Sequence, residues 1–362
     1  MTNSSDRIFL ELLQVSVGNK KKLDTPPSHD LWSEIFDIAK KQTLLGICAA
    51  GIEKLPDNQR PPREIAVKWG VMACRIERKN IMLNERAGEA ARFLADKGFR
   101  SCLLKGQGVA MLYPEPLRRQ CGDIDIWLDG GRKKIVELAD SIDKANKVCY
   151  HHVEFLRRRD VEIELHMRPS WMYSPLRNAR LQRWFRENHS WDEAMTSSGF
   201  HTPSIQFNAI YILCHIFRHL FDEGVGLRQL LDYYYVIKAF NKDASADMEK
   251  TRNSLRRLGL YKFCGAVMYV LCTVFGMSEN EVIVPVDEAE GRFLLDEVML
   301  AGNFGKYDER SMPQHGETKI RRFFRRQKRF SRFLRHYPEE TLCAPLWTVW
   351  HWCWRKYHLT FG

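Results

Sequence analysis

The chain has 362 residues, of which 44% are hydrophobic and 28% are charged. This composition excludes disorder over most of the chain and fits a large folded core with more than one subdomain. The formal net charge of +11 suits an anionic partner, whether a nucleotide, a nucleic acid or a membrane surface, but does not choose among them.

The region 1–98 is predicted to be helical after a loose start. Its first residues are polar and then Lys-rich, which predicts a poorly ordered lead-in. A helical pattern of apolar residues begins at Asp30, and a longer one runs from Glu64 to Lys97, where Gly98 is the stop signal.

The region 99–170 is predicted to be an α/β core. Short apolar runs of strand type alternate with helical patterns, and glycine or proline stands at the junctions. In chain order we expect a strand at Phe99–Leu104, a helix from Gly108 to Tyr113, a strand at Ile124–Leu128, a helix at Arg132–Ala145, and strands at Val148–Leu156 and Val161–His166 joined by a hairpin turn at Arg157–Asp160.

The rest of the chain is predicted to be helical, as a domain at 171–310 and a basic, tryptophan-rich tail at 311–362. The expected helical segments are 175–190, 204–240, 246–276, 286–302 and 316–336. The predicted fold class is therefore α+β, with a small mixed sheet and helices embedded in a largely α-helical protein.

The cysteines and apolar runs indicate a cytoplasmic protein. None of the ten cysteines forms a C-x-x-C pair, which predicts reduced and mostly buried thiols rather than a zinc site. We expect no secretory signal. The longest apolar run, Phe263–Met277, is shorter than the ~20 residues that span a bilayer, and we expect a buried core helix there.

Two aspartates stand at the start of the strand Ile124–Leu128. Asp123 and Asp125 are two residues apart, so on a strand both side chains point to one face. Two close carboxylates repel each other, and a divalent cation relieves that repulsion. Mg²⁺ is the natural ion, with Mn²⁺ as the alternative, because hard cations prefer oxygen ligands. The competing interpretation is an exposed strand end or an Asx turn.

A third acid and a glycine turn can complete such a site. Glu164 lies on the last predicted strand with His166 two residues on, although both residues also fit ordinary structural roles. Lys105 and Gly106 stand between a strand and a helix, where backbone N–H groups can approach a phosphate. Many strand-to-helix turns contain glycine, so this turn is a weak signal alone.

The order of these motifs resembles a known superfamily. A strand ending in Leu-Lys-Gly, then Arg-x-x-Gly-Asp-Ile-Asp-Ile, then Glu-Leu-His resembles the polymerase-β-like nucleotidyltransferases. The closest resemblance is to a bacterial family of uncharacterised nucleotidyltransferases, from about Trp32 to the helices near residue 240. It implies a nucleotidyltransferase-type sheet, with Asp123, Asp125 and Glu164 as catalytic metal ligands.

The resemblance also implies which residues contact substrate. Gly106 matches the turn that faces the triphosphate, Arg119 and Gly122 lead into the aspartates, and His166 closes the third strand. The turn departs from the superfamily, because Gln107 follows the glycine and Lys105 precedes it. Lys105 is then expected to supply the phosphate contact, and Gln107 is expected to contact substrate as part of the same turn.

Helical elements downstream complete the resemblance. They hold His215 and His219, four residues apart, and Arg228 and Asp232, also four apart. The resemblance implies that Arg228 and Asp232 lie near the substrate cleft, and we expect the two histidines to line the cleft or to bind a metal. The competing interpretations are a polar contact between helices for the histidines, and an Arg228–Asp232 pair.

The basic segment Arg321–Arg335 is amphipathic, and four tryptophans follow it between Trp347 and Trp354. Three interpretations compete: a helix docked on the protein, a helix on an anionic membrane, or a contact with nucleic acid. We favour packing combined with peripheral contact at the inner membrane surface, and no specific nucleic acid is predicted.

The predicted function is transfer of a nucleoside monophosphate from a nucleoside triphosphate to an acceptor hydroxyl, with Mg²⁺. Two alternatives remain open at this point. One is a related metal-dependent transferase with a sugar or phosphate donor, in the tailoring of natural products or surface polysaccharides. The other is a non-catalytic basic protein that binds membrane or nucleic acid.

Overall fold

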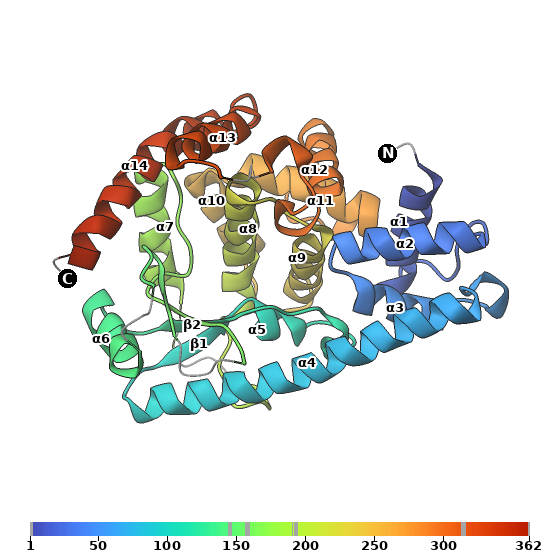
Figure 1. Ribbon diagram of the computed structural model, residues 1–362, viewed down its shortest axis with the longest axis horizontal. Coiled ribbons are helices and arrows are strands. Elements are labelled where there is room, and N and C mark those ends of the chain that lie inside the picture. The colour runs from blue at the N-terminus through green and yellow to red at the C-terminus, as the bar shows by residue number, and fades with distance from the viewer. Residues whose placement is uncertain are drawn as a thin grey trace.

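The structure is a computed structural model that describes residues 3–143, 147–155, 160–189, 191, 195–312 and 316–360, with side chains to residue 357. The predicted α+β class is confirmed, because a four-stranded mixed sheet lies within a mostly helical protein (Figure 1).

The sheet contains β1 (Ser101–Leu104), β2 (Ile124–Leu128), β3 (His152–Glu154) and β4 (Ile163–His166), in the spatial order β1-β2-β4-β3. β2 is antiparallel to β1 and parallel to β4, and β3 is antiparallel to β4. This register sets Asp125 of β2 beside Glu164 of β4. Neighbouring strands are about 4.8 Å apart, so the two carboxylates are held close by the backbone itself.

Alternation of side chains gives the sheet one apolar and one mixed face. The residues of β2 and β4 that pack toward the long helix beneath are Ile124, Ile126, Leu128, Ile163 and Leu165. Asp125, Glu164 and His166 alternate with them, and so does Trp127, whose ring packs against Phe207 of the helical domain with centroids 5.7 Å apart. The carboxylates therefore face the helical domain.

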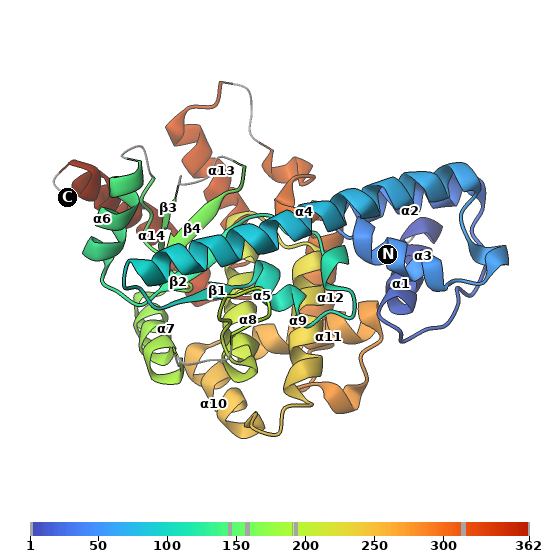
Figure 2. The ribbon, with the colours of Figure 1, turned by 90° about the horizontal axis from the view of Figure 1, so that it is seen from below.

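The long helix α4 (Arg63–Asp96) supports the apolar face of the sheet. Figure 1 shows it running beneath the strands, and Figure 2, seen from below, shows it crossing in front of β1 and β2. Its C-terminal half packs on the sheet through Leu83, Ala87 and Leu94. Its N-terminal half packs through Trp69 into the larger cluster, together with the first helices of the chain.

Three shorter elements connect the strands: α5 (Gly106–Ala110), η2 (Pro116–Arg118) and α6 (Arg132–Ile142). α5 begins two residues before the predicted start at Gly108. The predicted strand Val148–Leu156 is wrong in length, because the chain turns within it: the Cys149 N–H donates to the His152 carbonyl, and Val148 bridges Val153. Residues 157–159 of the predicted hairpin turn, and the end of the predicted helix at Ala145, lie outside the described residues.

The helical domain covers the mixed face. It contains α7 (Pro175–Asn188), α8 (Ile205–Asp222), α9 (Leu227–Phe240), α10 (Met248–Leu258), α11 (Tyr261–Phe275), η3 (Glu279–Glu281) and α12 (Glu288–Ala301). The predicted helices 204–240 and 246–276 are each divided in two. Gly224 and Gly259 have φ angles of +132° and +72°, and such left-handed residues end a helix. The buried helix expected within Phe263–Met277 is confirmed by α11.

The N-terminal residues correct the sequence-based prediction. The expected loose lead-in is wrong, because α1 (Ser4–Ser16) is a helix whose Phe9, Leu12 and Leu13 are 0% exposed. It packs with α2 (His29–Lys41), α3 (Leu45–Lys54) and α11, before the short η1 (Asp57–Gln59). The polar ends of the segment obscured an apolar stripe that needs these distant partners.

The C-terminal part consists of η4 (Asn303–Gly305), η5 (Glu309–Ser311), α13 (Lys319–Ser331) and α14 (Pro338–Thr360). Phe330, Phe333, Tyr337 and Trp347 belong to the larger apolar cluster, so one side of this region is docked. Within the described residues, no helix combines the length and the apolar character that crossing a bilayer requires.

The docking of α1 is testable by truncation of its core residue. Leu13→Ala is expected to lower the free energy of unfolding by about 2–5 kcal/mol, because it removes buried methyl groups and leaves a cavity. Urea denaturation measures the change. Arg7→Ala, whose side chain is 69% exposed, is the control and should change stability by no more than about 0.5 kcal/mol. Equal effects of the two substitutions would contradict a docked α1.

Candidate active site

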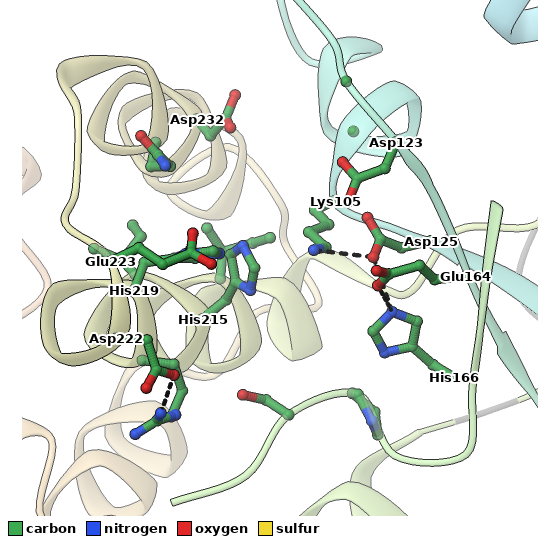
Figure 3. A pocket seen from close by; sticks show the side chains of 18 of the residues that line it. Lys105, Asp123, Asp125, Glu164, His166, His215, His219, Asp222, Glu223 and Asp232 are labelled. Carbon is green, nitrogen blue, oxygen red and sulfur yellow. Dashed lines mark hydrogen bonds and ion pairs between the residues drawn. The ribbon is translucent and has the colours of Figure 1, made fainter. Parts of the chain in front are cut away.

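Three carboxylates converge where β2 begins. Asp123 precedes β2, Asp125 lies on β2, and Glu164 lies beside it on β4. One oxygen atom from each lies within 4.8 Å of the other two, and Figure 3 shows all three pointing to one place. A compact set of carboxylate oxygens fits a hard divalent cation such as Mg²⁺.

His166 neutralises part of this negative charge. Its Nε2 lies 2.8 Å from Asp125 Oδ1 and 3.3 Å from Glu164 Oε2. Burial alone would lower the pKa of His166, but the bonds to the two carboxylates raise it to about 9. Burial alone would raise the pKa of Glu164, yet His166, His152 and Lys105 lower it to about 2. Both groups are therefore charged at neutral pH.

Lys105 is the second counter-cation. Its Nζ lies 3.0 Å from Asp125 Oδ1. Burial opposes the ammonium charge, but Asp125, Asp123 and Glu164 outweigh burial and raise the pKa of Lys105. Lys105 and Gly106 have φ angles of +40° and +43°, a left-handed turn that costs a non-glycine residue about 1–3 kcal/mol. The turn places the ammonium group over the carboxylates.

Two histidines that the sequence-based prediction missed stand on the other side of Glu164. His152 Nδ1 lies 3.1 Å from Glu164 Oε2 and 3.1 Å from His151 Nε2. Burial lowers the pKa of His152 to about 4 in spite of the carboxylate, so this imidazole is neutral and can be a metal ligand. His152, Glu164 and His166 form a second set with ligand spacing. The signal in the sequence was two adjacent histidines, His151 and His152, in the predicted strand that precedes the strand with Glu164 and His166.

A cavity of about 320 Å³ opens between these groups and the helices α8 and α9. The predicted site residues that line it are Lys105, Gly106, Arg119, Asp123, Asp125, Glu164, His166, His215, His219, Arg228 and Asp232. Gln107 is the exception: its side chain is buried, at 1% exposure, away from the cavity lining. The tertiary structure thus brings residues separated by more than a hundred positions to one space.

On the wall formed by α8, His215 and His219 face the carboxylates across the cavity (Figure 3). Their rings touch, with centroids 4.3 Å apart, and His219 Nδ1 lies 3.5 Å from Glu223 Oε2. Burial holds the pKa of His215 well below its usual range. This imidazole is therefore neutral at pH 7.

Arg119 and Asp232 bind each other at the edge of the cavity. Arg119 Nε and Nη2 donate to the two Asp232 oxygens at 2.6 and 2.7 Å, and the Tyr113 hydroxyl donates to Oδ1 at 2.6 Å. The pairing of Asp232 with Arg228 that the helical spacing allowed is wrong. Arg228 instead donates from Nη1 to the Gln120 carbonyl at 2.8 Å.

Arg218, Asp222 and Trp171 also line the cavity, although sequence analysis did not select them. Arg218 stands inside the apolar run Ile216–Phe221, between the two histidines of the helical motif. A cation within an apolar helical segment was the available signal, because a buried charge needs a partner or a ligand.

Comparison with known proteins identifies a family for this chain. A sequence profile of the family described as Uncharacterised nucleotidyltransferase matches residues 28–276, more than half of the chain. The chain belongs to this nucleotidyltransferase family. The resemblance inferred from the motifs is confirmed. No curated protein and no solved structure gives a significant match.

Membership in the nucleotidyltransferase family supports a transferase of phosphorus-containing groups with a nucleotide substrate. The matched range contains the whole sheet together with α8 and α9, and so contains every carboxylate described above. α13 and α14 lie beyond it. The acidic cluster belongs to the part of the chain that the nucleotidyltransferases share.

The Arg119–Asp232 pair is expected to hold α9 against the loop before β2. Asp232→Asn removes the charge that compensates a buried guanidinium, and such a loss typically costs about 3–5 kcal/mol. Urea denaturation should show this decrease in the free energy of unfolding. The double variant Arg119→Met/Asp232→Leu removes both charges and should recover part of the loss. A double variant less stable than the single one would contradict this role.

Proposed function

We propose that the protein transfers a nucleoside monophosphate from a nucleoside triphosphate to an acceptor hydroxyl, with Mg²⁺ or Mn²⁺. The observation that carries this proposal is the oxygen cluster of Asp123, Asp125 and Glu164, within 4.8 Å, beside a cavity lined with cationic side chains. These three residues would hold the ion, which supplies neutralisation of phosphate charge when bound.

We assign binding of the triphosphate to two cations. Lys105 lies at the carboxylates, as described above. Arg228 is 9% exposed, and within the described residues it has no ion pair and its Nε has no hydrogen-bond partner. Burial and the neighbouring Arg119 lower the pKa of Arg228, against the opposing effect of Asp232. A buried guanidinium without a carboxylate gains most from an anionic ligand.

The transfer itself needs positioning and one proton acceptor. The acceptor oxygen forms a bond to the α-phosphorus, and the bond to the pyrophosphate oxygen breaks. The proton of the acceptor hydroxyl passes to a basic group of the cavity, and we assign that role to the neutral imidazole of His215. Glu164 already contacts both His152 and His166 beside the other two carboxylates, a position that suits a metal ligand better than a general base.

Substitution of the two aspartates Asp123 and Asp125 tests the proposal. The protein is incubated with each α-labelled triphosphate, Mg²⁺ and a cell extract, and label in the product is measured. Asp123→Asn/Asp125→Asn is expected to reduce transfer by at least about 100-fold, the order associated with lost electrostatic stabilisation. EDTA should have the same effect on the unaltered protein.

The control for this experiment is Asp129→Asn. Asp129 follows the same strand but pairs with Arg100 at the surface, away from the cavity. It should transfer label as the unaltered protein does. Equal transfer by the double variant would refute the proposal. A product heavier by a hexose or by one phosphate, in place of a nucleoside monophosphate, would show the alternative donor class.

We also propose that α13 and α14 contact the anionic cytoplasmic surface of a membrane. The outward face of α14 is apolar and follows helical spacing: Leu342, Leu346 and Val349 are 64%, 73% and 54% exposed, and Trp350 is 43% exposed. Exposed cations of α13 (Arg321 and Lys328) and of the turn after it (Arg335) lie in the same part of the chain. An amphipathic helix with apolar and cationic residues suits the interface of anionic lipid.

Liposome flotation tests this contact. At low salt the protein is expected to float with vesicles of phosphatidylglycerol and phosphatidylcholine, and less with phosphatidylcholine alone, because anionic lipid attracts the cations. Leu346→Glu should reduce the floated fraction severalfold. Leu300→Glu, at a residue that is 45% exposed on α12, is the control. A protein that stays soluble under all conditions, or that covers this face by self-association in sedimentation, would contradict the proposal.

A further inference from the structure

Arg218 lies in an aromatic frame on the α8 wall of the cavity. It is 5% exposed, and its Cζ lies 3.7 Å from the centre of the Trp171 ring and 3.9 Å from that of Tyr173. Both Arg218 and Trp171 line the cavity. Stacking on two rings fixes the plane of a guanidinium group and leaves its edges for hydrogen bonds.

The hydrogen bonds of Arg218 are incomplete. Its Nη2 binds Asp222 Oδ2, but within the described residues Nε and Nη1 are buried without a hydrogen-bond partner. Unsatisfied buried donors are uncommon, and each costs about 1–3 kcal/mol. A ligand in the cavity that accepts from this guanidinium would remove that cost.

The carboxylate that pairs with Arg218 also has other partners. Asp222 is shared, because it accepts hydrogen bonds from two other side chains. Arg326 Nη2 donates to it at 3.2 Å, and the Tyr173 hydroxyl also donates to it. Burial alone would lower the pKa of Arg218, but Asp222 and Tyr173 raise it above its usual range. Two guanidinium groups thus share the one carboxylate of Asp222.

The C-terminal helix holds the frame in place. Glu340 of α14 accepts the backbone N–H groups of Tyr173 and Ser174 at 2.7 and 3.2 Å. Trp347 stacks on the far side of Trp171, with centroids 4.3 Å apart and planes 11° apart. The loop that carries both aromatic rings is therefore pre-organised, as a binding site requires.

We propose that Arg218 binds an anionic group, a carboxylate or a phosphate, of the acceptor molecule. This inference rests on the transferase function proposed above. Binding of the donor triphosphate is assigned to Lys105 and Arg228, and both of these side chains interact with the charge of Asp123. Arg218 interacts instead with Asp222, Tyr173 and Glu340, and Figure 3 shows Asp222 at the opposite end of the cavity from Asp123. The acceptor is thus an anionic molecule with a free hydroxyl.

Binding of small probes without Mg²⁺ or nucleotide tests the site. Glycerol 3-phosphate, D-glycerate and glycerol are titrated into the protein by calorimetry. One or both anions should bind, and neutral glycerol should not. Arg218→Gln should weaken anion binding by roughly 10- to 100-fold, as expected for a lost charge-assisted hydrogen bond. Arg218→Lys keeps the charge without the planar fork and should bind with intermediate affinity.

Two further variants separate this inference from the proposed function. Arg177→Gln is the matched control: Arg177 pairs with Glu339 near the same loop but lies outside the cavity lining, so anion binding should be unchanged. Asp123→Asn should lose affinity for Mg²⁺-bound triphosphate and keep anion binding. If it keeps both affinities, the proposed function fails while the Arg218 site stands.

Three results would overturn the inference. The first is that neither anion binds the unaltered protein. The second is that Arg218→Gln and Arg177→Gln reduce anion binding equally, which would indicate a role in holding the loop alone. The third is that Arg218→Gln weakens binding of the Mg²⁺-bound triphosphate by the same factor as the anions, which would make Arg218 a contact of the donor.

Discussion

Mutual repulsion of the carboxylates at the start of β2 is the constraint on which the rest of the site depends. The parallel register of β2 and β4 puts Asp125 beside Glu164, and Asp125 is 1% exposed. Buried carboxylates at this spacing are unstable without cations. The chain supplies two cations of its own, Lys105 from a strained turn and His166 from the next position on the same face of β4. A divalent ion would share the same oxygens with them.

The layers of the fold follow from this one polar face. The apolar face of the sheet is covered by α4, whose other half packs with the N-terminal helices. An apolar surface over the polar face would cost free energy, because the charged groups would be buried without hydrogen-bond partners. The helical domain meets it with a cavity, and it places histidine, arginine and aspartate there. The Arg119–Asp232 pair joins the two halves at the rim of this space.

The C-terminal helices have a part in the same arrangement. Their inward residues, including Phe330, Phe333 and Trp347, belong to the larger apolar cluster. Trp347 supports Trp171, which in turn stacks on Arg218. This accounts physically for one of the clustered tryptophans. The outward residues of α14 are apolar without a covering surface in the described chain. The same helix thus supports the cavity wall through Trp347 on one side and presents an apolar face on the other.

The sequence by itself determined which residues share a face. A period of two put Asp123 and Asp125 on one face of their strand and Glu164 and His166 on one face of theirs. The long pattern from Glu64 to Lys97 predicted the supporting helix within one residue at each end. These features depend on local spacing, which is visible in the chain. The glycines at which the predicted long helices divide were visible as well, but their left-handed conformation was not.

The tertiary structure alone decided what lies against each face. Helical spacing allowed Asp232 to pair with Arg228, but the close approach of the loop before β2 gave it Arg119 instead. Likewise, α1 folds because α3 and α11 cover its apolar stripe, and Arg218 belongs to the cavity because Trp171 and Asp222 surround it. Contacts between residues far apart in the chain depend on the global packing. Local periodicity shows which residues share a face, but it contains no information about which distant residues that face will meet.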